Sequence, residues 1–251
     1  MLDIHTKIDK KKRILLFIDY DGTLAPIVDD PDRAFLSDDT REVLVKISEK
    51  FTTSIVTGRS LNTISNFLHP LPPLLSLATC HGHEIAMPNT RTHMVGEHLV
   101  DQLQAVKRLL VAHVLPDGAL LEDNKYCLSI HYRRLSDEER KALDQRVNEV
   151  LDGYDGIRRT YGHLVYELRV DAGWDKGEAV KWILKHNGVS ENSDHCMPIY
   201  LGDDITDEDG FEAVKKYKHG LGIIVGSREP SVAHARLSSP SDVRDFLRVL
   251  L

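Results

Sequence analysis

Two acidic clusters, each directly after a short apolar segment, carry the side chains best suited to chemistry. The first is DYDGT at residues 19–23, which follows the apolar run at residues 14–18. Because side chains two apart on an extended segment point the same way, Asp19 and Asp21 can converge on one bound atom. One carboxylate can then attack an electrophile while the other moves protons. Taken alone, the same spacing is also typical of a solvated turn.

The second cluster is GDDITDED at residues 202–209, after the apolar run at residues 199–201. Its five carboxylates repel one another unless a cation or solvent separates them. An EF-hand calcium loop does not fit, because the register with Gly210 at its sixth position has Lys216 at its twelfth. Oxygen ligands without paired histidine or cysteine favour Mg²⁺ over zinc. An acid-rich helix N-terminus is the structural alternative.

Two further motifs offer groups that bind anionic oxygens. Thr57, Gly58 and Arg59 follow the apolar run at residues 51–56 and provide a hydroxyl, an adaptable backbone and a guanidinium. A helix N-cap is the structural alternative for this motif. Lys176 begins a predicted helix, where the helix dipole disfavours a lysine and a bound phosphate would relieve that cost. The alternative for Lys176 is an ordinary surface lysine.

The elements that position these motifs follow an α/β pattern. Continuous apolar runs, including those that precede the motifs, predict strands buried on both faces, as in a parallel sheet with helical crossovers. Helical periodicity at residues 40–50 and 176–186 predicts such crossovers, and residues 241–251 predict a closing amphipathic helix. Open α/β sheets bind their ligands at the carboxyl ends of the strands. We therefore expect the motifs to share that edge.

The middle of the chain has a different pattern. Residues 97–115 and 137–151 have helical periodicity, whereas residues 126–132 and 164–170 alternate as half-exposed strands do. The sequence therefore predicts an α/β core formed by residues 1–97 and 174–251. It also predicts that an α+β domain at residues 98–173 interrupts this core.

Composition and charge exclude several classes of protein. The formal net charge of −7, from 32 basic and 39 acidic residues, disfavours nonspecific binding to nucleic acid or to an anionic membrane. Three scattered cysteines without a CxxC pair favour a reducing compartment over a disulfide framework. The run at residues 14–18 is too short for a signal sequence or a membrane span. We expect a soluble, cytoplasmic protein.

Together and in this order, the motifs resemble the haloacid-dehalogenase (HAD) superfamily of phosphatases and, more narrowly, the trehalose-6-phosphate phosphatases. The resemblance implies a HAD-like Rossmannoid core with a parallel sheet, plus an inserted α+β cap domain of the C2 type. It spans nearly the whole chain. The matching segments are DYDGTLAPIVDDPDRA (19–34), TGR (57–59), HGHE (81–84), NKYCLSIHYR (124–133), YELR (166–169), WDKGEAV (174–180) and GDDITDEDGF (202–211).

The resemblance implies roles for the catalytic residues. Asp19 would attack phosphorus to form an aspartyl-phosphate, and Asp21 would protonate the departing sugar oxygen and then take a proton from the attacking water. Mg²⁺ would be held by Asp19, the backbone carbonyl of Asp21, and Asp203. Asp204 and Asp207 would orient these ligands or the lysine. The groups implied for holding the substrate phosphate are Thr57, Lys176, Gly22, Gly58 and Arg59.

The resemblance also places sugar recognition in the inserted domain. The family often has Glu-x-Lys before its HYR motif, whereas here Glu122 and Asn124 have that spacing and Lys125 stands one residue later. A polar domain surface is the structural alternative for these side chains. The residues implied to contact the sugar are Glu122, Lys125, His131, Arg133 and Glu167.

The function expected from this resemblance is Mg²⁺-dependent hydrolysis of trehalose 6-phosphate to trehalose and phosphate. A phosphatase for another sugar phosphate, of the sucrose-phosphate or mannosyl-phosphoglycerate type, is the first alternative. A non-catalytic sugar-phosphate sensor is the second. Pathway logic adds trehalose-phosphate synthase as a possible partner, and neither nucleic acid nor a membrane is expected as one.

Overall fold

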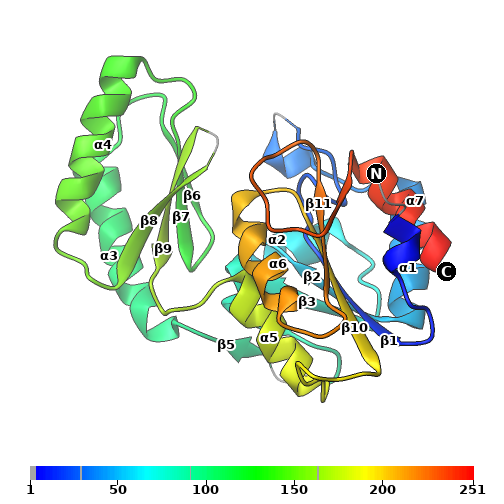
Figure 1. Cartoon of the computed structure of the whole chain (residues 1–251). Coiled ribbons are helices and arrows are strands. Elements are labelled where there is room, and N and C mark those ends of the chain that lie inside the picture. Colours follow the sequence, from blue (N-terminus) through cyan, green and yellow to red (C-terminus); the bar gives the residue numbers. More distant parts are fainter. Residues whose placement is uncertain (1–3, 29, 91, 163) are drawn as a thin grey trace. The chain divides into compact units, whose positions relative to one another are not determined.

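The computed structural model describes residues 4–28, 30–90, 92–162 and 164–251. The chain forms two compact units, one comprising Met1–His93 and Asp175–Leu251 and the other comprising Met94–Trp174 (Figure 1). The smaller unit, drawn mainly in green, is therefore inserted into the sequence of the larger one.

The larger unit contains a mixed sheet that is mostly parallel. Within the described residues it has eight strands in the order β12-β11-β10-β1-β2-β3-β4-β5. The strands from β12 to β3 pair in parallel, and β4 is antiparallel to β3. The predicted parallel sheet is thus present, and β1 and β10 are neighbours at its centre (Figure 1). The strands are β1 (Arg13–Ile18), β2 (Thr52–Val56), β3 (Leu75–Thr79), β4 (Glu84–Ala86), β5 (His93–Met94), β10 (Cys196–Gly202), β11 (Leu221–Val225) and β12 (Ala235–Leu237).

Helices connect these strands, and side-chain caps define where several of them begin. The side chains of Ser37, Ser60, Asp175 and Ser239 each accept a hydrogen bond from a backbone N–H of the first helical turn. Such caps satisfy donors that a helix cannot pair internally. The helices are α1 (Asp38–Lys50), α2 (Leu61–Phe67), α5 (Lys176–His186), α6 (Glu208–Lys215) and α7 (Pro240–Leu250), with short 3₁₀ turns η1 (Ile4–Lys7), η2 (Pro31–Arg33), η3 (Cys80–Gly82) and η6 (Ile205–Asp207).

Strand β1 is buried on both faces, as its unbroken apolar run predicts. Ile14, Leu16 and Ile18 belong to the core cluster that includes apolar side chains of α1 and α7. Leu15 and Phe17 point to the opposite face and are equally buried. This rigid central strand fixes the position of Asp19 at its carboxyl end.

In its described residues, the smaller unit combines a four-stranded antiparallel sheet with the helices α3 and α4. The strand order is β6-β7-β9-β8 among the residues described. The predicted alternating strands correspond to β7 and β9, whereas β6 and β8 were not expected from the sequence. The elements are η4 (Glu97–Leu99), α3 (Val100–Leu109), the π-helical turn η5 (Leu110–Val114), β6 (Leu120–Asp123), β7 (Cys127–His131), α4 (Asp137–Leu151), β8 (Ile157–Gly162) and β9 (Val165–Val170).

In the part of the chain that the structure describes, no helix has the length and apolar character needed to cross a membrane.

Candidate active site

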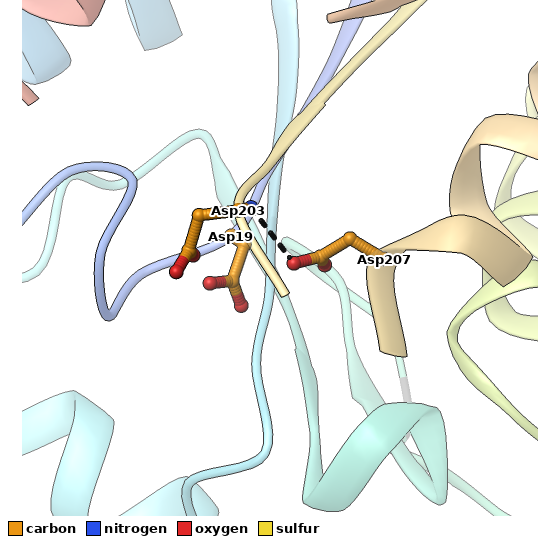
Figure 2. Close-up of side chains that lie close together, drawn as sticks. All are labelled: Asp19, Asp203 and Asp207. Atoms are coloured by element: carbon orange, nitrogen blue, oxygen red, sulfur yellow. Dashed lines mark hydrogen bonds between the residues drawn. The ribbon is translucent and has the colours of Figure 1, made fainter. Parts of the chain in front are cut away.

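Asp19 and Asp203 follow neighbouring parallel strands and therefore meet at one edge of the sheet. Ile18 of β1 pairs with Leu201 of β10, and the Asp19 N–H donates to the Leu201 carbonyl at 2.9 Å. Asp19, Asp203 and Asp207 each contribute one carboxylate oxygen to a cluster, and these three oxygens lie within 4.8 Å of one another. Figure 2 shows the side chains of Asp19 and Asp203 beside each other, with Asp207 of η6, four residues after Asp203, on the other side. The two acidic motifs thus form one site.

Lys176 joins two of these carboxylates. Its ammonium donates to Asp19 Oδ1 at 2.8 Å and to Asp207 Oδ1 at 2.7 Å. The Asp175 side chain caps α5 and so sets Lys176 in the first helical turn. Its side chain is only 4% exposed, so the surface-lysine alternative is wrong. The two aspartates offset the cost of a buried ammonium near the positive end of the helix dipole.

The carboxylate of Asp207 accepts hydrogen bonds from several groups around the site. Its Oδ1 also accepts from the Tyr200 hydroxyl at 2.7 Å, and its Oδ2 accepts the backbone N–H groups of Asp203 and Asp204 at 3.0 Å each. With the bond from Lys176, four donors surround a fully buried carboxylate. A metal ion would have to displace several of these bonds. Asp19 and Asp203 are therefore the carboxylates best placed to hold a cation.

The electrostatics of Asp19 and Asp203 favour a bound cation. Burial, reinforced by the negative charge of Asp207, raises the pKa of Asp203 to about 7. Burial also raises the pKa of Asp19, although the ammonium of Lys176 opposes this effect. A cation between the two carboxylates would favour their ionised forms. The donor set is made of carboxylate oxygens, which fits a hard divalent ion.

Gly22 and Thr23 fix the position of the Asp203 carboxylate. The Thr23 hydroxyl donates to Asp203 Oδ1 at 3.1 Å. A Cβ at Gly22 would lie 2.2 Å from Asp203 Oδ2, and the φ of +80° at Gly22 is a conformation that favours glycine. The turn after β1 can therefore approach Asp203 only with glycine at this position. Sequence reasoning gave Thr23 no separate role, although it lies within the DYDGT motif.

Asp21 has an arginine partner that the sequence did not predict. Arg59 donates from Nε to Asp21 Oδ2 and from Nη2 to Asp21 Oδ1, both at 2.6 Å. Its Nη2 also donates to the Pro31 carbonyl at 2.9 Å, and the guanidinium lies 4.6 Å from the centre of the Phe67 ring. Arg59 is predicted to bind substrate anions, and in this structure it contacts the carboxylate of Asp21. The two-point contact orients the Asp21 carboxylate.

The TGR motif at residues 57–59 packs against the turn that follows β3. The His81 N–H donates to the Thr57 carbonyl at 2.9 Å, and a Cβ on Gly58 would lie 2.7 Å from the His81 ring. His81 has a φ of 57°, which is strained for a residue with a side chain. The N-cap of α2 is Ser60, so the N-cap alternative for the TGR motif is wrong. Thr57 is buried at the carboxyl end of β2, the neighbour of β1.

The acidic segment 202–209 divides into two parts. Asp203 and Asp207 belong to the carboxylate cluster, while Asp204 contributes through its backbone. Glu208 and Asp209 lie in the first turn of α6, as the alternative of an acid-rich helix N-terminus predicts. The alternative of an acid-rich helix N-terminus is therefore correct for Glu208 and Asp209, whereas Asp203 and Asp207 remain candidates for a metal site.

The proposed sugar-contacting residues fall into two groups within the smaller unit. In the sheet, Glu122 of β6 pairs with Ser129 of β7, which pairs with Glu167 of β9, so these side chains share a face. His131 lies two residues beyond Ser129 on that face, and its Nε2 is 3.4 Å from Glu122 Oε2. The other two residues lie outside the strands: Lys125 in the turn between β6 and β7 and Arg133 after the end of β7.

Comparisons with known proteins agree with this architecture. The model of the trehalose-phosphatase family matches residues 17–242. The trehalose 6-phosphate phosphatase RA3 of Zea mays is 37% identical over 257 residues, which cover 96% of this chain and 70% of that protein. Trehalose-phosphate phosphatase B of Arabidopsis thaliana is 38% identical over 264 residues, which cover 100% of this chain and 70% of that protein.

Solved structures show the same fold. A crystal structure of a trehalose-6-phosphate phosphatase related protein has a TM-score of 0.77 at 27% identity, covering 94% of this chain and 96% of that one. A haloacid dehalogenase-like hydrolase from Bacteroides thetaiotaomicron, at 16% identity, has a TM-score of 0.68 and covers 96% and 100% of the two chains. The predicted HAD-like α/β fold and the predicted resemblance are both confirmed. The chain belongs to the trehalose-phosphatase family.

Proposed function

We propose that this chain is a Mg²⁺-dependent phosphatase that hydrolyses trehalose 6-phosphate to trehalose and phosphate. The observation that carries the proposal is a buried carboxylate, Asp19, that is held by Lys176 beside Asp203 at the carboxyl edge of the sheet. Family membership supports the reaction class and the substrate. A non-catalytic sensor would not need this combination of nucleophile, lysine and paired carboxylates.

The reaction has two displacements at phosphorus. In the first, an Asp19 carboxylate oxygen forms a bond to phosphorus while the bond from phosphorus to the sugar oxygen breaks, and Asp21 supplies the proton to that oxygen. In the second, a water oxygen attacks the phosphorus of the aspartyl-phosphate and gives a proton to Asp21. Phosphate leaves, and the Asp19 carboxylate is restored. Arg59 orients Asp21 for both proton transfers.

The remaining groups of the larger unit bind the phosphate and the metal ion. Asp19, Asp203 and the backbone carbonyl of Asp21 would hold Mg²⁺. When bound, the ion neutralises negative charge between the nucleophile and the substrate. Asp207 and Asp204 keep these ligands and Lys176 in position. The groups that we assign to the phosphoryl oxygens are Thr57, Lys176, Gly22, Gly58 and Arg59.

Sugar recognition is assigned to the inserted domain. We assign residues 1–97 and 174–251 to the catalytic core and residues 98–173 to a C2-type cap, which the division into two compact units supports. A disaccharide has many hydroxyl groups, and charged or imidazole side chains on one sheet face suit their recognition. The proposed contacts are Glu122, Lys125, His131, Arg133 and Glu167.

Cellular context is a separate part of the proposal. The scattered cysteines support a cytoplasmic location, and pathway logic supports association with trehalose-phosphate synthase. Fractionation of cells and co-purification with the synthase test these two points independently of the enzymology.

A panel of sugar phosphates tests the proposed substrate. We expect kcat/KM for trehalose 6-phosphate to exceed that for sucrose 6-phosphate, glucose 6-phosphate and mannosyl-phosphoglycerate by about 100-fold or more, because unpaired polar groups penalise the wrong sugar. Excess chelator should stop turnover, and added Mg²⁺ should restore it. Preference for another sugar phosphate would contradict the substrate, whereas full activity in chelator would contradict the metal dependence.

A further inference from the structure

Tyr200 lies in the middle of the buried strand β10 in a slot that fits its ring. The side chain is fully buried, and its ring meets the Phe211 ring edge-on with the centroids 5.5 Å apart. A Cβ at Gly210 would lie 2.4 Å from the Tyr200 ring, so glycine at that position makes room for it. The tyrosine is therefore held in one orientation by the start of α6 and by its own strand.

The hydroxyl of Tyr200 is directed at the catalytic site. It donates to Asp207 Oδ1 at 2.7 Å, and the same oxygen accepts from Lys176 at 2.7 Å. Lys176 in turn donates to Asp19 Oδ1 at 2.8 Å. A continuous series of short hydrogen bonds thus runs from the strand interior to the proposed nucleophile. A hydroxyl in an apolar strand costs free energy unless it is paired, and here its partner is the side chain of Asp207.

The Tyr200 hydroxyl and the Lys176 ammonium both donate to Asp207 Oδ1, so the loss of one bond affects the other. The Oδ2 atom is already bonded to two backbone N–H groups. Without the Tyr200 hydroxyl, Lys176 would be the remaining donor to Oδ1 among the described residues. A carboxylate oxygen that has lost one donor attracts the other more strongly. The ammonium would then move toward Asp207 and away from Asp19.

We propose that Tyr200 is a positioning residue for phosphoryl transfer, which acts through Asp207 and Lys176 to hold the carboxylate of Asp19. The inference rests on the proposed function, because it assumes that Asp19 attacks phosphorus. In this proposal Tyr200 affects the position of the nucleophile, Asp19, and does not affect the departure of the leaving group. Loss of its hydroxyl should therefore slow attack on any phosphate monoester, whatever group departs.

The variant Tyr200→Phe tests this role with two substrates, trehalose 6-phosphate and p-nitrophenyl phosphate. We expect kcat/KM to fall by about 10- to 100-fold on both, as for loss of a hydrogen bond to a charged group. The loss should be mainly in kcat. Affinity for Mn²⁺, measured by electron paramagnetic resonance without substrate, should stay unchanged. In a crystal structure of the variant, Lys176 Nζ should lie farther from Asp19 and closer to Asp207.

Tyr20→Phe is the matched control. Tyr20 is also fully buried, and its hydroxyl donates at 2.8 Å to the Ala34 carbonyl, which is not part of the carboxylate cluster. Removing it should lower the melting temperature to a similar extent and leave both activities nearly unchanged. Thermal unfolding of both variants verifies that each is folded at the assay temperature.

Three results of the activity assays would overturn the inference: full activity of Tyr200→Phe, equal losses in Tyr20→Phe, or a loss confined to trehalose 6-phosphate. A parallel loss of Mn²⁺ affinity would also overturn it, because the hydroxyl would then act on the metal site. If the unaltered chain hydrolyses only p-nitrophenyl phosphate, the proposed substrate is wrong. The comparison between the two tyrosine variants then still decides the role of Tyr200.

Discussion

The larger and the smaller unit carry their proposed functional side chains in different environments. In the larger unit, Lys176 is 4% exposed and Asp207 is fully buried, and both belong to a set of short, directed hydrogen bonds. In the smaller unit, the Glu122 and His131 side chains are 44% and 34% exposed and lie 3.4 Å apart at their nearest polar atoms. Chemistry is thus assigned to a preorganised, buried site and sugar recognition to a hydrated surface. Substitutions should therefore cost far more in the first region than in the second.

The largest effect is expected at the nucleophile. Asp19→Asn removes the attacking carboxylate, so turnover should fall on the order of 10⁴-fold or more. Phosphate release under saturating substrate measures this, and circular dichroism establishes that the variant is folded. Substantial residual activity in a preparation free of contaminating phosphatase would contradict the assignment of Asp19.

A large loss of stability is expected at Lys176. Lys176→Met leaves Asp19 and Asp207 buried without their shared cation, which should lower the free energy of unfolding by about 3–5 kcal/mol. The matched control is Lys107→Met in the smaller unit, where Lys107 contacts Asp123 at a similar 2.8 Å but is 36% exposed. That change should cost at most about 1 kcal/mol. Denaturant unfolding measures both, and equal costs would contradict the contrast between the regions.

An intermediate effect is expected at Arg59. Arg59→Lys keeps the charge but cannot reproduce the two-point contact with Asp21, so kcat/KM for trehalose 6-phosphate should fall by about 10- to 100-fold. The loss on p-nitrophenyl phosphate should be smaller, because p-nitrophenolate leaves without a proton. Arg41→Lys is the control, since the guanidinium of Arg41 donates to the backbone carbonyls of Phe67 and His69. Equal losses on both substrates would show that Arg59 does not act through proton transfer to the leaving group.

The smallest effect is expected in the smaller unit. Glu122→Gln should raise KM for trehalose 6-phosphate by about 3- to 10-fold, because it weakens one partly hydrated contact. The kcat value and the hydrolysis of p-nitrophenyl phosphate should stay unchanged. If kcat/KM falls as much as expected for Arg59→Lys, and the fall is in kcat, then the two regions do not divide chemistry and recognition in this way.

Local patterns predicted most of the larger unit and less of the smaller one. The apolar run at residues 14–18 became β1 because an unbroken apolar segment can be buried on both faces of a parallel sheet. Strand β8 was not predicted, since its sequence IRRTYG contains two arginines and little alternation. The structure explains it: Arg159 lies 4.7 Å from the Tyr161 ring and 5.0 Å from the Tyr166 ring. The first contact lies within β8 and the second crosses to β9, and together they stabilise a strand without a local hydrophobic pattern.

The sequence by itself determined which motifs are candidates for the chemistry and at which edge of the sheet they gather. Strand periodicity and the types of residue that follow each strand are local, so both can be read along the chain. Only the tertiary structure decided how the charges pair. Asp21 meets Arg59 across 38 positions, Lys176 meets Asp19 across 157, and Tyr200 reaches Asp207 from inside the strand. Partner choice depends on which side chains folding brings within hydrogen-bond distance and removes from water, and local spacing does not encode either.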